Sequence, residues 1–65
     1  MLDTKQRLDF DAWLAELKAD FVARKAMKED EAQSYVYDNR PDWREYYDDR
    51  FEPTDAASEN MTYWD

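Results

Sequence analysis

Hydrophobic residues recur at helical spacing along the first third of the chain. Between Asp9 and residue 26, apolar side chains return every third or fourth position, which places them on one side of a helix. Asp9 is a good N-cap, because its carboxylate can accept a hydrogen bond from the first helical turn. The pattern predicts a helix over residues 9–26. Its apolar stripe is formed by Phe10, Trp13, Leu14, Leu17 and Phe21.

Acidic residues and two prolines divide the rest of the chain. The acidic residues 29–31 suit the first turn of a helix, where the helix dipole favours negative charge. Tyr35 and Val36 supply an inward face, and Pro41 follows shortly after. The residue before a proline avoids the α conformation, whereas proline itself is well tolerated at a first helical position. We therefore predict helices over residues 29–39 and 41–51, and a fourth over 53–59 that begins at Pro53.

Length and composition favour a single small helical domain over residues 1–65. Glycine is absent, which disfavours hairpins that need positive φ. The three Trp, five Tyr and three Phe can each bury about 150–250 Å². We expect an all-α bundle of three to four short helices, with Tyr63 or Trp64 packed back on the helices or placed in an interface. The predicted core is Phe10, Trp13, Leu14, Leu17, Phe21, Tyr35, Val36, Trp43 and Tyr47.

The absence of cysteine and histidine removes several kinds of chemistry. There are no disulfides, no common zinc sites and no usual nucleophile–base pair. Residues 38–42 space two acids like the start of a calcium loop, but Arg40 and Pro41 lie inside it and the glycine is missing. We therefore expect no enzyme activity, no cofactor and no metal. No secretion signal or membrane-spanning stretch is visible, and a cytoplasmic, soluble protein is expected.

The net charge of −8 comes from one half of the chain. Residues 1–28 hold five acidic and six basic residues, whereas residues 29–65 hold twelve acidic and three basic ones. Such asymmetry disfavours direct binding to nucleic acid or to an anionic membrane, and it favours a basic partner.

Residues 41–51 contain both aromatic and acidic residues. A helix here would carry aromatic rings on one side and carboxylates on the other. The acids could form an ordinary solvated face. However, Glu45 has like charges three and four positions away, at Asp42 and Asp49, and such pairs destabilise a helix. A face kept acidic at that cost suggests a binding role. The candidate partner-binding residues are Asp38, Asp42, Glu45, Tyr46, Asp48, Asp49 and Glu52.

Brevity, the lack of Cys, His and Gly, and the acidic, aromatic segment 29–59 together resemble a known class of proteins. They are the small acidic proteins with which bacteriophages disable host nucleic-acid-binding complexes, including DNA mimics and anti-CRISPR proteins. The resemblance is one of composition, since that class shares no sequence motif. It implies a non-enzymatic inhibitor in the bacterial cytoplasm, whose carboxylates replace nucleic-acid phosphates on a basic surface, for example that of a CRISPR effector.

Two alternatives would use apolar contacts instead. The chain could be a small helical adaptor or antitoxin-like subunit that binds through its aromatic tail and its first helix. It could also be a homodimeric structural protein in which Tyr63 and Trp64 pack across a two-fold axis. Binding that weakens strongly with salt would favour the acidic surface over both alternatives.

Overall fold

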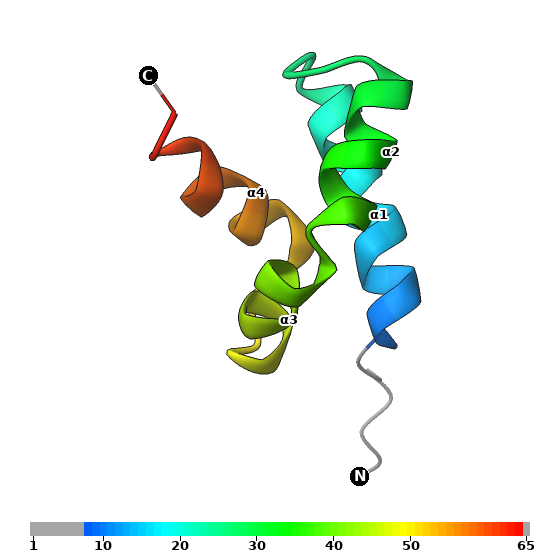
Figure 1. Ribbon diagram of the computed structural model, residues 1–65. Helices are drawn as coiled ribbons and strands as arrows, with labels where there is room; N and C mark the ends of the chain where they lie inside the picture. Colours follow the sequence, from blue (N-terminus) through cyan, green and yellow to red (C-terminus); the bar gives the residue numbers. More distant parts are fainter. Residues whose placement is uncertain (1–7, 65) are drawn as a thin grey trace, which may run out of the picture.

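The computed structural model describes residues 8–64, and this part of the chain forms four helices and no strand (Figure 1). The helices are α1 (Phe10–Ala23), α2 (Glu29–Asp38), α3 (Arg40–Asp48) and α4 (Pro53–Met61). The all-helical class is confirmed, and so is the fourth helix. The predicted bounds 9–26, 29–39, 41–51 and 53–59 differ from the observed ones by up to three residues.

The first helix begins as the sequence predicts but ends earlier. The Asp9 carboxylate accepts a hydrogen bond of 2.8 Å from the Ala12 amide, which confirms the N-cap. At the other end Lys25 adopts a positive φ of 60°. This turn lets the Ala26 amide bond back to the Phe21 carbonyl at 3.0 Å, and the helix stops at Ala23. The apolar pattern gave no sign of this turn, because the residue that makes it is not glycine.

The third helix also ends shortly before a residue with a positive φ angle. Arg50 has a φ of 68°, and the Phe51 amide donates to the Tyr46 carbonyl at 3.0 Å. The rings of Phe51 and Tyr46 are 5.1 Å apart, which supplies the hydrophobic contact typical of this helix ending. Phe51 therefore lies beyond the helix, not on it, although it still packs against the core.

The bundle is arranged around α1, which packs against each of the other three helices. In Figure 1, α2 runs antiparallel beside α1, while α3 and α4 lie on the other side of the view. Six of the nine predicted core residues are buried. These are Trp13, Leu14, Leu17, Phe21, Val36 and Trp43. The other three, Phe10, Tyr35 and Tyr47, are half-buried and packed against that core.

The sequence pattern missed the contribution of α4 to the core. Pro53, Ala56 and Ala57 are buried in α4, and Ala56 and Ala57 belong to the core cluster. Alanine gives a weak hydrophobic signal, yet its small side chain lets two helix backbones approach closely. The close packing of α4 on α1 follows from these small residues.

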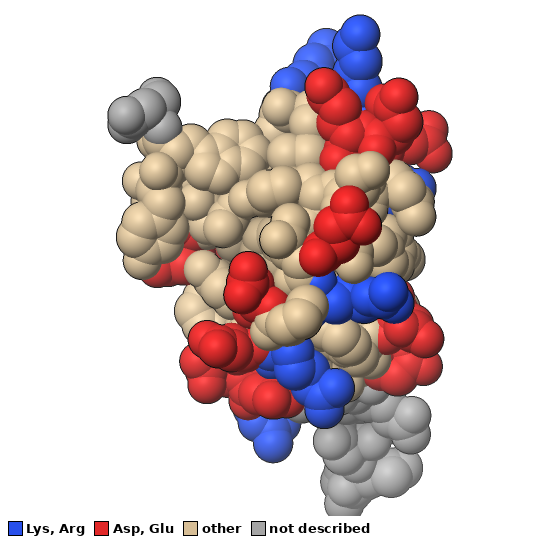
Figure 2. All heavy atoms as spheres, viewed as in Figure 1, with Lys and Arg blue, Asp and Glu red and all other residues tan. Residues whose placement is uncertain are grey.

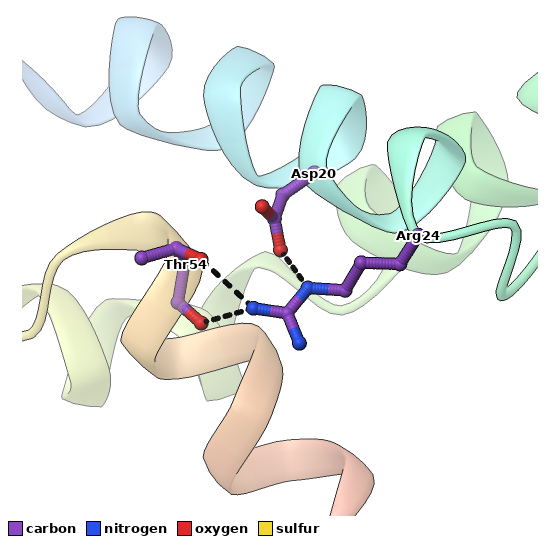
Figure 3. Close-up of polar contacts among 3 residues, drawn as sticks. All are labelled: Asp20, Arg24 and Thr54. Carbon is purple, nitrogen blue, oxygen red and sulfur yellow. Dashed lines mark hydrogen bonds and ion pairs between the residues drawn. The ribbon is translucent and has the colours of Figure 1, made fainter.

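Arg24, at the end of α1, links that helix to the start of α4 (Figure 3). Its guanidinium is ion-paired with Asp20 one turn earlier. The same group donates to the Thr54 carbonyl at 3.1 Å and to the Thr54 hydroxyl at 2.8 Å. A cation of the basic half of the chain is thus used to hold the fold together.

The aromatic tail folds back on the bundle, as expected for one of its two rings. Trp64 stacks on Phe21, with ring centroids 5.9 Å apart and planes 10° apart. Tyr63, by contrast, is 74% exposed. In residues 8–64 no helix combines the length and the apolar character needed to cross a lipid bilayer.

Candidate functional site

The candidate site is the outward side of α3. We call Asp42, Glu45 and Asp49 the α3 acidic face. All three side chains are exposed, while Trp43 on the other side of the helix is only 2% exposed. Figure 2 shows carboxylates gathered over α3, at the lower left of the view. Burial of Trp43 fixes the rotation of the helix, so the α3 acidic face points to solvent.

The α3 acidic face is not neutralised by the cations of the described chain. Within residues 8–64, Asp42, Glu45 and Asp49 take part in no ion pair. Asp48 differs, because its carboxylate lies 3.1 Å from Nε of Arg44. Of the predicted binding acids on α3, Asp48 is therefore the one whose charge is already matched by this helix.

Two of the neighbouring arginines, Arg40 and Arg44, are held by other groups, whereas Arg50 is exposed after Asp49 and forms no ion pair within residues 8–64. The guanidinium of Arg44 lies over the rings of Phe10 and Tyr47, at 5.1 and 5.6 Å from their centroids. Nε of Arg40 donates to the Tyr37 carbonyl at 3.2 Å. Both cations sit beside the acidic face without pairing with it, which leaves its field available to a partner.

The helix bears an electrostatic cost for this arrangement. Glu45 has Asp42 three positions before it and Asp49 four positions after it, and each such like-charge pair costs about 0.2–0.5 kcal/mol. Asp49 also sits at the C-cap of α3, where the helix dipole disfavours an anion. The stability of the helix therefore does not account for these carboxylates.

The remaining two predicted acids lie just before and just after α3 in the chain. Glu52 is exposed and precedes α4, and its side chain forms no capping hydrogen bond. Asp38 lies at the end of α2, in an open groove of about 570 Å³. The same groove is lined by Asp30, Glu31, Ser34, Tyr35, Asp38 and Asn39.

Asp30 and Glu31 are additions that the sequence analysis assigned only to the start of a helix. Asp30, Ser34 and Asp38 are spaced by four, which places them on one side of α2. This four-residue spacing in the sequence already indicates that Asp30 and Asp38 lie on the same side of α2. Figure 2 shows carboxylates over the start of α2 and over α3 on the same side of the molecule, with cationic side chains at the top and beside α3.

Tyr46 lies where α3 meets α2 and α4, and it is half-buried. Burial raises its pKa above the usual value, and the nearby Tyr63 and Glu59 act in the same direction. Tyr46 therefore presents a neutral hydroxyl at neutral pH. Beside it, the Tyr35 hydroxyl donates to the Asn60 side chain at 2.7 Å. Asn60 could not be predicted from the sequence, because only the fold brings α4 close to Tyr35 and Tyr46.

The two buried tryptophans, Trp13 and Trp43, differ in the hydrogen bonding of their indole N–H groups. Nε1 of Trp13 donates to the Phe51 carbonyl at 2.9 Å. Nε1 of Trp43 is the one buried side-chain polar atom in residues 8–64 without a hydrogen-bond partner. The Trp43 ring is in contact with the rings of Phe21, Tyr35 and Tyr46.

The chemistry available on this surface is the binding of cations by carboxylates and aromatic rings. The described residues contain no group of three or more side chains placed to hold a metal ion. No family model, curated protein or solved structure matches the chain.

Proposed function

We propose that this chain is a non-enzymatic binding protein whose α3 acidic face engages a basic surface of a partner protein. The partner surface would be one that normally binds nucleic acid, as in a CRISPR effector, and the chain would act as an inhibitor in the bacterial cytoplasm. The observation that carries the proposal is the set of three exposed carboxylates on α3 that have no ion pair within residues 8–64.

The mechanism is competition by charge. A nucleic-acid-binding surface presents lysine and arginine side chains that are placed to pair with phosphates. Carboxylates fixed on a helix can pair with the same side chains, and one arginine can donate hydrogen bonds to both oxygens of a carboxylate at once. Asp42, Glu45 and Asp49 would supply the central charge, with Asp38 and Glu52 at the ends. Long-range attraction would also speed the encounter at low salt.

Apolar docking through the tail receives less support. Trp64, half of the proposed apolar contact, is stacked on Phe21 within the same molecule. Of the two tail rings, Tyr63 is the one that is largely free of the bundle, at 74% exposure. Trp64 is itself 39% exposed, but exposed large side chains that are scattered singly are an ordinary feature of a protein surface.

The test is a capture experiment with matched charge variants. The immobilised protein is exposed to bacterial lysate, and bound proteins are identified by mass spectrometry. Glu45→Lys/Asp49→Lys changes the α3 acidic face, and Glu16→Lys/Ala19→Lys/Ala23→Lys makes the same change in net charge at exposed positions of α1. The proposal predicts that nucleic-acid-binding proteins are captured by the wild type and by the α1 variant, and that the α3 variant loses them.

Two further readouts sharpen the result. Duplex DNA should displace the captured proteins, and the apparent affinity should fall steeply with salt. The proposal is wrong if the α3 variant captures the same proteins as the wild type, or if the proteins captured have no nucleic-acid-binding surface.

A further inference from the structure

A small pocket, which we call the junction pocket, opens where α2, α3 and α4 meet. Its volume is about 110 Å³. Three of its six lining residues are aromatic, and the others are two amides and a carboxylate. The six are Tyr35, Asn39, Asp42, Trp43, Tyr46 and Asn60.

The aromatic walls of the junction pocket stand at steep angles to one another. The Tyr35 and Trp43 rings are 5.8 Å apart, with planes at 76°. The Trp43 and Tyr46 rings are 5.6 Å apart, with planes at 60°. Rings at such angles pack edge to face. Since Trp43 is only 2% exposed, an entering group would contact mainly the half-buried rings of Tyr35 and Tyr46. The faces of aromatic rings carry negative charge density and attract cations.

The polar residues that line the junction pocket also favour a cation. Asp42 is exposed, takes part in no ion pair within residues 8–64, and lines the pocket. No lysine or arginine is among the lining residues. Hydrogen bonds hold the surrounding groups in place, since Asn39 donates to the Tyr35 carbonyl at 2.7 Å and the Tyr35 hydroxyl donates to Asn60. The lining of the pocket thus combines one carboxylate with three aromatic rings and contains no cationic side chain.

We propose that the junction pocket binds the cationic head group of a lysine or arginine side chain from the partner protein, with Asp42 as its counter-ion. The pocket has room for several water molecules and therefore for an ammonium or guanidinium group. The inference rests on the proposed function and adds a specific anchor to it. The α3 acidic face supplies long-range attraction, and the junction pocket holds one side chain of the partner.

The test uses small model compounds, so that no partner is needed. N-acetyl-lysine methylamide and N-acetyl-arginine methylamide are titrated into the isotope-labelled protein, and amide and indole signals are followed by NMR. The neutral controls are the norleucine and citrulline analogues. The cationic compounds should shift the Trp43 indole signal and the amides near Asp42, Tyr46 and Asn60, while the neutral analogues do not. The stronger of the two cations tells which side chain the pocket prefers.

Two variants at exposed positions locate the effect. Asp42→Asn should weaken the binding of the cationic compounds by about two- to fivefold, because it removes the counter-ion. Asp49→Asn makes the same chemical change on the α3 acidic face but outside the pocket, and it should weaken binding less than Asp42→Asn does. Circular dichroism checks that both variants retain the helical content of the wild type.

The inference is overturned if neutral and cationic compounds bind alike, if neither cation binds, or if Asp42→Asn and Asp49→Asn have equal effects. Its failure is distinguishable from that of the proposed function. Capture of basic proteins that depends on Glu45 and Asp49 but not on Asp42 would leave the proposed function and remove the anchor. Cation binding in the pocket without capture of nucleic-acid-binding proteins would keep the cation site and contradict the proposed function.

Discussion

α1 and α3 each bury one side, but they differ in how many residues they bury and in whether their charged side chains form ion pairs. α1 buries four residues, Trp13, Leu14, Leu17 and Phe21, whereas α3 buries Trp43 alone. The side chains that serve the fold in α1 include its charges. Arg24 pairs with Asp20, and Lys18 lies 3.6 Å from Glu29 of α2. In α3, by contrast, the α3 acidic face pairs with nothing in residues 8–64.

This contrast separates residues that fold the chain from residues that are available for binding. A helix that packs against three neighbours is constrained along most of its length. α3 buries Trp43 and packs the half-buried rings of Tyr46 and Tyr47 against the core, while its outer side carries like charges that weaken the helix. The substitutions below test whether α1 and α3 really differ in this way.

The largest effect is expected in α1. Phe21→Ala removes a fully buried ring that contacts Tyr35, Trp43 and Trp64. Such truncations cost about 3–5 kcal/mol, which is as much as the whole stability of a domain of this size. The variant should be largely unfolded by circular dichroism at 25 °C. Glu45→Ala on α3 should change the free energy of unfolding by less than about 0.5 kcal/mol. Comparable losses in the two variants would remove the contrast.

The two buried tryptophans allow a matched comparison of α1 with α3. Trp13 and Trp43 are each 2% exposed, but only the indole of Trp13 has a hydrogen-bond partner, the Phe51 carbonyl. Trp13→Phe should therefore cost about 1–2 kcal/mol more than Trp43→Phe, because it also leaves that carbonyl without its donor. Urea denaturation of the two variants measures the difference. Equal losses would show that the hydrogen bond from Trp13 adds nothing to the stability.

A smaller effect, of opposite sign, is expected where α1 ends. Lys25 has a φ of 60°, a conformation that costs a residue with a Cβ atom about 1–2 kcal/mol. Lys25→Gly should stabilise the fold by about 0.5–1 kcal/mol, after allowance for the greater freedom of glycine in the unfolded chain. Lys25→Ala, which removes the same charge but keeps Cβ, is the control and should give no such gain. Thermal unfolding followed by circular dichroism distinguishes the two.

Those parts of the fold that depend on local pattern could be predicted from the sequence. The apolar stripe and the Asp9 cap located α1, and Pro41 and Pro53 located the starts of α3 and α4 to within one residue. Helix ends were less predictable, because Lys25 and Arg50 make turns that usually need glycine.

The candidate site was predictable to a similar degree. The α3 acidic face could be found because its carboxylates share one helix. The junction pocket could not, since it depends on Asn60 and Tyr35 meeting across a separation of 25 residues. The pairing of Arg44 with Asp48, by contrast, could be predicted from their four-residue spacing on one helix.

The central claim is that the carboxylates of the α3 acidic face do not serve the fold. The most direct test is the free energy of unfolding of Glu45→Gln/Asp49→Asn, measured by urea denaturation at low salt against the wild type. The account predicts a stability that is unchanged or higher by up to about 1 kcal/mol, because the change removes like-charge pairs and an anion at the end of the helix. A loss of more than about 1 kcal/mol would show that these carboxylates stabilise the folded chain, and it would contradict the account.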